Sequence, residues 1–119
     1  MRILGYPKVQ QISSTEWRLL EALEYHVGDE NSAEVINVPE GFITDFASVP
    51  RAFWWLFPPF GRYSPGAVIH DFLYTYKVYN RKKCDDIFLE AMQVMEVNWQ
   101  TRYTMYWAVR VFGSFAYGR

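Results

Sequence analysis

The chain has 119 residues, half of them hydrophobic, and its 12 Lys and Arg against 13 Asp and Glu give a formal charge of −1. This balance argues against a strongly electrostatic nucleic-acid binder, which carries a surplus of basic residues, and an aromatic content of 19% argues against a disordered chain. The apolar runs are far shorter than the ~20 residues that a transmembrane helix needs, and the N-terminus breaks at Pro7 before a signal-peptide core forms. A single cysteine, Cys84, permits no intrachain disulfide. We therefore expect one domain without a transmembrane segment, located in the cytoplasm and stabilised by packing.

The first forty residues predict β-structure. Residues 33–38 are rich in β-branched side chains and partly alternating, and residues 17–27 are long enough for a strand. Turn-forming residues at 28–31 separate the two segments. We expect segments 17–27 and 33–38 to pair as a hairpin, although residues 21–24 would also suit a helix.

Residues 39–65 hold five of the six prolines of the chain, which excludes both a helix interior and a central strand. The same stretch is rich in large apolar side chains, so we expect a structured loop that packs against the rest and carries function. Within it, Trp54 and Trp55 could bind a partner or wedge the loop into the core.

The last third predicts three helices, because apolar residues recur there at three- and four-residue spacing. The first covers residues 67–78, after Pro65 and Gly66, and the second covers residues 82–97. The third begins near residue 100 and ends before Gly113. The predicted fold class is therefore α+β: an N-terminal hairpin or small sheet, a long packed loop and a three-helix C-terminal part.

The sharpest candidate site is the segment His70-Asp71-Phe72-Leu73-Tyr74. His70 and Tyr74 are four residues apart and share one helix face. A histidine on a packed helix can act as a general base near neutral pH, and the neighbouring carboxylate of Asp71 can hold a metal ion. Gly66, four residues earlier, lets the backbone approach a ligand closely. The alternative is a buried His70 bonded to a backbone carbonyl, with Asp71 placed near the helix N-terminus by the helix dipole.

Asp85 is the second candidate, because it lines up with the apolar face of the predicted second helix. An unpaired buried carboxylate is costly, so Asp85 needs a partner. Arg81, one turn earlier, would form an ordinary ion pair. His70 would instead be oriented by the carboxylate for catalysis. The sequence leaves both partners open.

The third candidate is the Gly/Pro-bounded segment 41–51, where Thr44, Asp45 and Ser48 bring oxygen atoms together. Such loops suit hard cations such as Ca²⁺. The alternative is an Asx-turn or helix cap made by Asp45 or Ser48. We count Thr44, Ser48 and Arg51, together with the tryptophan pair, as candidate binding residues.

Four motifs are more specific in combination: GFITDFASVPR at 41–51, PPFG at 58–61, HDFLY at 70–74 and DDIFLEAM at 85–92. Together they resemble a family of small proteins of unknown function from tailed bacteriophages and prophages, over residues 34–113. The resemblance implies a phage origin and supplies no agreed activity.

Residues 45–92 are also similar to the bacterial and fungal type of secreted phospholipase A2. In those enzymes an Asp-x-x-Ser loop precedes a proline, a helix with His-Asp-x-x-Tyr and a later helix with an Asp before x-x-Phe. The matching positions are Asp45, Ser48, Pro65, His70, Asp71, Tyr74, Asp85 and Phe88. The resemblance implies that His70 is a general base toward water, oriented by Asp85, with Tyr74 steadying that carboxylate. It further implies a Ca²⁺ site at Asp71 and the Asp45 loop.

Two features depart from those enzymes. They are exported and stabilised by disulfides, whereas this chain has one cysteine. With the helices as predicted, His70 lies roughly 7 Å further from the interhelical turn than Asp85, at 1.5 Å per residue. This spacing favours Tyr74 or Arg81 as the partner of Asp85, and a His70–Asp85 bond needs an earlier end to the first helix or a tilted crossing.

These interpretations lead to three expected functions. The first is a bacteriophage component, in the tail, baseplate or neck or in assembly, with other phage proteins as partners at residues 53–60 and the C-terminal helix. Such a protein is found in the host cytoplasm during assembly and then in the virion. The alternative is a small metal-assisted hydrolase, with Ca²⁺ as cofactor and membrane lipid as a substrate. An inhibitor of host defence also fits the size.

Overall fold

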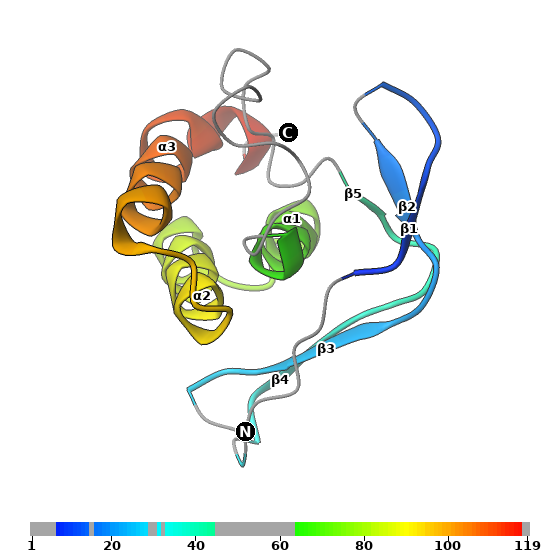
Figure 1. Ribbon diagram of the computed structural model, residues 1–119, viewed down its shortest axis with the longest axis horizontal. Helices are drawn as coiled ribbons and strands as arrows, with labels where there is room; N and C mark the ends of the chain where they lie inside the picture. Colours follow the sequence, from blue (N-terminus) through cyan, green and yellow to red (C-terminus); the bar gives the residue numbers. More distant parts are fainter. Residues whose placement is uncertain (1–6, 15, 29–30, 32, 45–63, 118–119) are drawn as a thin grey trace.

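The computed structural model describes residues 7–14, 16–28, 31, 33–44 and 64–117, with side chains up to residue 111. Within these ranges, short strands come first and helices follow (Figure 1). The strands are β1 (Val9–Gln11), β2 (Trp17–Leu19), β3 (Leu23–His26), β4 (Val35–Val38) and β5 (Ile43–Thr44). The helices are α1 (Ser64–Tyr76), α2 (Arg81–Val94) and α3 (Trp99–Tyr117). The fold class is α+β, as the sequence predicts.

The strands form two small antiparallel sheets. One has the order β1-β2-β5, and the other pairs β3 with β4, with Leu23 opposite Val38 and His26 opposite Val35. The predicted hairpin is therefore right for β3 and β4 but wrong for the start of its first segment. Trp17 lies opposite Thr44 in the other sheet, because pairing with β1 and β5 draws β2 away from β3.

Side chains alternate along these strands, which places one face of each sheet on the core. Alternate side chains of β2 and β3 are buried, and Ile36 and Val38 of β4 are buried with them. Helix α1 lies between the other two helices and the sheets (Figure 1), and it contacts α2, α3, β4 and β5. The element that carries the HDFLY motif is therefore the centre of the fold.

Helix α1 begins and ends earlier than the sequence predicts. Pro65 and Gly66 lie inside its first turn, where a proline is tolerated because the missing N–H has no partner in the helix. At the other end, Lys77 adopts a left-handed φ of 50° and Val78 N donates to Leu73 O at 3.2 Å. This 6→1 bond is a Schellman cap, so α1 ends at Tyr76 and not at residue 78.

Helices α2 and α3 also differ at their ends. Asn80 caps α2, since its side-chain oxygen accepts from Lys83 N at 2.8 Å. A second Schellman cap, with Glu96 at φ 59° and a bond from Val97 N to Met92 O of 2.9 Å, ends α2 near residue 95. Helix α3 continues through Gly113 to Tyr117, so the predicted end before Gly113 is wrong.

Polar contacts tie the β3–β4 sheet to the helices. Glu90 of α2 accepts hydrogen bonds from the Tyr25 hydroxyl and from Gly28 N. Glu34 accepts from Tyr79 at 2.7 Å and from Lys83 at 3.0 Å. Burial and the bond to Glu34 raise the pKa of Tyr79 to about 12, so its hydroxyl stays a donor. No helix in the described ranges has the length and apolar character needed to cross a membrane.

Candidate functional site

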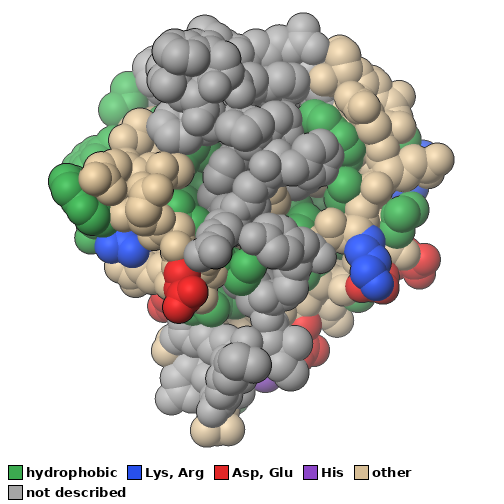
Figure 2. All heavy atoms as spheres, in the orientation of Figure 1, with side chains coloured by type: hydrophobic (Ala, Val, Ile, Leu, Met, Phe, Trp, Pro, Cys, Tyr) green, Lys and Arg blue, Asp and Glu red, His purple; other side chains and the backbone are tan. Residues whose placement is uncertain are grey.

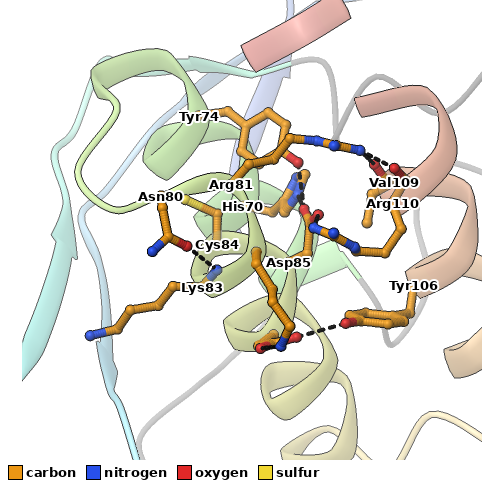
Figure 3. A network of polar contacts seen from close by, with 12 residues as sticks. His70, Tyr74, Asn80, Arg81, Lys83, Cys84, Asp85, Tyr106, Val109 and Arg110 are labelled. Carbon is orange, nitrogen blue, oxygen red and sulfur yellow. Dashed lines mark hydrogen bonds and ion pairs between the residues drawn. The ribbon is translucent and has the colours of Figure 1, made fainter. Parts of the chain in front are cut away.

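A buried cluster of polar side chains lies where the three helices meet (Figure 3). His70 of α1 and Asp85 of α2 are 2% and 0% exposed, and His70 Nε2 lies 2.6 Å from Asp85 Oδ1. The Tyr74 hydroxyl, one turn further along α1, donates to the same oxygen at 2.5 Å. The His70 ring also lies against the rings of Tyr74 and Phe88, with centroids 4.1 and 5.0 Å away. The structure thus brings together the three residues predicted to be catalytic.

The expected obstacle to a His70–Asp85 bond disappears with the true helix ends. His70 lies six residues before the end of α1, and Asp85 lies four residues after the start of α2. At 1.5 Å per residue the axial offset is roughly 3 Å and not roughly 7 Å. The Schellman cap at Lys77 supplies the earlier end of α1 that the bond requires, so the two contacts to Tyr74 and His70 coexist.

The charge state of Asp85 determines the tautomer of the histidine. Burial alone would raise the pKa of Asp85, but hydrogen bonds from His70, Tyr74 and Arg110 outweigh it and lower the pKa. An ionised carboxylate only accepts hydrogen bonds, so His70 Nε2 must donate. In a neutral ring the proton then sits on Nε2 and the lone pair on Nδ1. Nδ1 is therefore the nitrogen that carries the lone pair, and it is buried.

Arg110 of α3 completes the surroundings of Asp85, and sequence reasoning missed it. Its Nη1 lies 2.9 Å from Asp85 Oδ2, with the side chain of Arg110 26% exposed and that of Asp85 fully buried. The bond to Asp85 raises the pKa of Arg110. Asp85 thus accepts from all three neighbours, and its charge is balanced by a cation on the third helix.

Arg81 does not have the predicted role of ion-pair partner. Its Nη2 donates to the backbone carbonyls of Val109, at 3.2 Å, and of Arg110. Arg81 therefore fastens the start of α2 to the middle of α3, next to the residue that does reach Asp85.

A spacing in α3 could have pointed to Arg110. Tyr106 and Arg110 are four residues apart and share a helix face. The Tyr106 hydroxyl donates to Asp86 at 2.7 Å, so consecutive acids of α2 meet consecutive turns of α3. Asp86 also pairs with Lys82 of the same helix at 2.8 Å, so its carboxylate contacts both α2 and α3.

The structure describes two of the remaining predicted site residues. Thr44 is fully buried in β5, and Asp71 is half-buried in α1 beside His70. Asp45, Ser48, Arg51, Trp54 and Trp55 lie outside the described residues. In the ranges that are described, no three His, Cys, Asp or Glu side chains lie close enough to hold a metal ion.

Gly66 serves packing rather than ligand approach. A Cβ built at this position would lie 3.2 Å from Ala91 Cβ and 3.2 Å from Phe88 Cδ1. The glycine therefore lets α1 lie close to α2 one turn before His70, which corrects the prediction that its backbone approaches a ligand.

Comparison with known proteins places this architecture in a family. Residues 17–109, from the start of β2 almost to the end of the polar cluster, match the family described as Protein of unknown function (DUF1353). The chain belongs to the DUF1353 family. No curated protein and no solved structure gave a significant match. The DUF1353 match includes His70, Tyr74 and Asp85, whereas Arg110 is the residue directly after it.

Proposed function

We propose that this protein is a small hydrolase of ester or related bonds, with His70 as the general base. The observation that carries the proposal is the bond between His70 Nε2 and Asp85 Oδ1, made inside the core and supported by Tyr74 and Arg110. A carboxylate on one ring nitrogen orients the imidazole and leaves the other nitrogen for proton transfer. The resemblance of residues 45–92 to phospholipase A2 supports the same assignment.

The proposed reaction is attack of water on an ester. His70 Nδ1 takes a proton from the water as the water oxygen bonds to the acyl carbon. The ester C–O bond then breaks, and the proton passes from His70 to the leaving oxygen, which yields an acid and an alcohol. Asp85 stays ionised throughout, because its hydrogen bonds and Arg110 stabilise the carboxylate.

Calcium is a further part of this proposal. The resemblance assigns it to Asp71 and the Asp45 loop, and a bound Ca²⁺ would polarise the carbonyl under attack. Of these two parts of the expected site, Asp71 lies in the described ranges and Asp45 does not. We therefore derive no step through the ion and treat its binding as a separate test.

A structural role in a bacteriophage particle or its assembly is the second proposal. It is favoured by the burial of the cluster, since His70 and Asp85 are at most 2% exposed and the contacts of Asp85 connect all three helices. A buried polar network of this kind can hold helices in one arrangement without any reaction. The resemblance to tailed-phage proteins supports it.

One experiment separates the two proposals. The chain has two histidines, so His26 can serve as the control for His70. Acid release is measured from phosphatidylglycerol vesicles and from short-chain acyl esters, with wild type, His70→Gln and the matched control His26→Gln. His26 lies at the end of β3 and contacts Glu24 at 2.9 Å. A general base contributes about 10²–10⁴-fold, so His70→Gln should lose at least ~100-fold while the control keeps activity.

The two variants must both be shown to fold by circular dichroism and thermal unfolding. If wild type is no faster than His70→Gln on either substrate class, the hydrolase proposal is wrong. The particle proposal would then be tested by mass spectrometry of purified phage particles, in which it predicts this chain at a fixed ratio to the other particle proteins.

A further inference from the structure

We propose that the outer face of α3 binds the surface of an anionic membrane. The face is defined by four residues, which we call the α3 stripe: Trp99, Tyr103, Trp107 and Val111. This inference goes beyond the proposed hydrolase and does not depend on His70 being catalytic.

The α3 stripe is a regular feature of the helix. Its members recur every four residues, so they follow one face of α3 over about 18 Å. Their exposures are 63%, 41%, 59% and 63%, whereas Met105 and Val109 on the opposite face are buried. Figure 2 shows hydrophobic side chains gathered at the left edge of the molecule, over α3. Three exposed aromatic rings in register are not required by the core of this fold.

The charge of α3 favours an anionic surface. From residue 99 to residue 117 the sequence has two arginines and no aspartate or glutamate. Arg110 is paired with the buried Asp85, so Arg102 supplies the charge that a surface can meet. The guanidinium of Arg102 lies 5.3 Å from the ring centroid of Tyr103, so a cation accompanies the stripe. Among the described residues, the acids next to α3 are Asp85, which is buried and paired with Arg110, Asp86, which is paired with Lys82, and Glu96, which precedes the helix. Tryptophan and tyrosine with neighbouring arginines are typical of segments that lie in the membrane–water interface.

The size of the stripe argues against a stable protein interface. An aromatic side chain has roughly 150–250 Å² of surface. Because its three rings are 41–63% exposed, the stripe presents roughly 250–400 Å² of aromatic surface in total. This area is well below the ~800 Å² that each partner buries in a stable complex. Shallow insertion into a bilayer interface needs no such area, because amphipathic rings find both apolar chains and water there. A membrane is therefore the occupant that these observations favour.

The test is co-sedimentation with sucrose-loaded vesicles of phosphatidylglycerol or of phosphatidylcholine. Wild type should bind the anionic vesicles at least ~5-fold more tightly than the neutral ones, since one arginine near an anionic surface contributes about 1 kcal/mol. It should bind less tightly as salt is raised, because the charge attraction is screened. The variant Trp99→Ser/Trp107→Ser should lose at least ~10-fold in affinity. The matched control is Leu20→Ser/Val35→Ser, two exposed apolar residues on the strand side of the molecule at 48% and 42%, which should bind as wild type does.

Three results would overturn the proposal: no binding to either vesicle, equal binding to both, or equal loss in the control variant. A dimer that forms with rising concentration and is abolished by the tryptophan variant would assign the α3 stripe to a second copy of the chain instead. His70→Gln should bind vesicles as wild type does, so a failure of the hydrolase proposal and a failure of this one are distinguishable.

Discussion

Replacement of Asp85 by alanine is the most informative perturbation of the polar cluster. The substitution removes the acceptor of three donors at once: His70 Nε2, the Tyr74 hydroxyl and Arg110 Nη1. Asp85 itself is fully buried, and so is His70. Water therefore replaces the carboxylate poorly, and the donors on α1 lose their partner inside the core.

The expected cost follows from this geometry. Removing one member of a buried ion pair typically destabilises a protein by about 3–5 kcal/mol. For 119 residues, an unfolding entropy of ~2.1 cal/mol/K per residue gives roughly 4 °C per kcal/mol. Asp85→Ala should therefore lower the unfolding midpoint by about 12–20 °C in a calorimetric or circular-dichroism melt.

The exposed ion pair of the same helix supplies the control. Lys82 is 70% exposed and pairs with Asp86, and exposed pairs of this kind contribute about 0–1 kcal/mol. Lys82→Ala leaves the Tyr106–Asp86 hydrogen bond in place and should thus lower the midpoint by about 4 °C or less. If the two alanine variants melt within ~4 °C of each other, Asp85 does not stabilise the contacts between the three helices in the way proposed.

Three further predictions concern acid, packing and metal. The folded pKa of Asp85 is lowered from its ordinary value, so its stabilisation is fully present above the unfolded pKa of ~3.9 and is lost as the pH falls through the folded pKa. The urea-unfolding free energy should then drop less between about pH 4 and pH 2 in Asp85→Asn than in wild type, and equal drops would contradict the assignment. Gly66→Ala should cost about 1–3 kcal/mol in urea unfolding, because its Cβ meets Ala91 at 3.2 Å; an unchanged midpoint would show that the helices can separate without cost. If Asp71 binds Ca²⁺, the ion at ~100 times its Kd should raise the melting midpoint by roughly 10 °C, and Asp71→Asn should abolish the shift; no shift in wild type would remove the calcium part of the proposal.

The helices could be predicted because apolar spacing is a local property of the sequence. The ends of the helices could not be predicted in this way. Both Schellman caps use non-glycine residues, Lys77 and Glu96, in the left-handed region. Glycine is the usual signal at that position, so the sequence carries no mark of where α1 ends. Without such a signal, the sequence predicts too late an end for α1 and therefore too large an axial offset between His70 and Asp85.

Tertiary pairing explains the other differences. Residues 17–27 read as one β-segment, yet β2 and β3 join different sheets because their partners lie elsewhere in the chain. Asp85 was recognisable as a buried carboxylate from its helix face alone, but its cation is Arg110, 25 residues later. Only the packing of α3 on α2 selects Arg110 over the local candidate Arg81.

The most direct test of the central claim, that Asp85 orients His70 as a base, is a long-range ¹H–¹⁵N correlation spectrum of the histidine side chains. The spectrum contains two rings, and His26→Gln assigns them. We expect the neutral ring of His70 to carry its proton on Nε2, with Nδ1 as the unprotonated nitrogen. We also expect this preference to be lost in Asp85→Ala. A proton on Nδ1 in the wild-type protein, or a tautomer unchanged by Asp85→Ala, would contradict the claim.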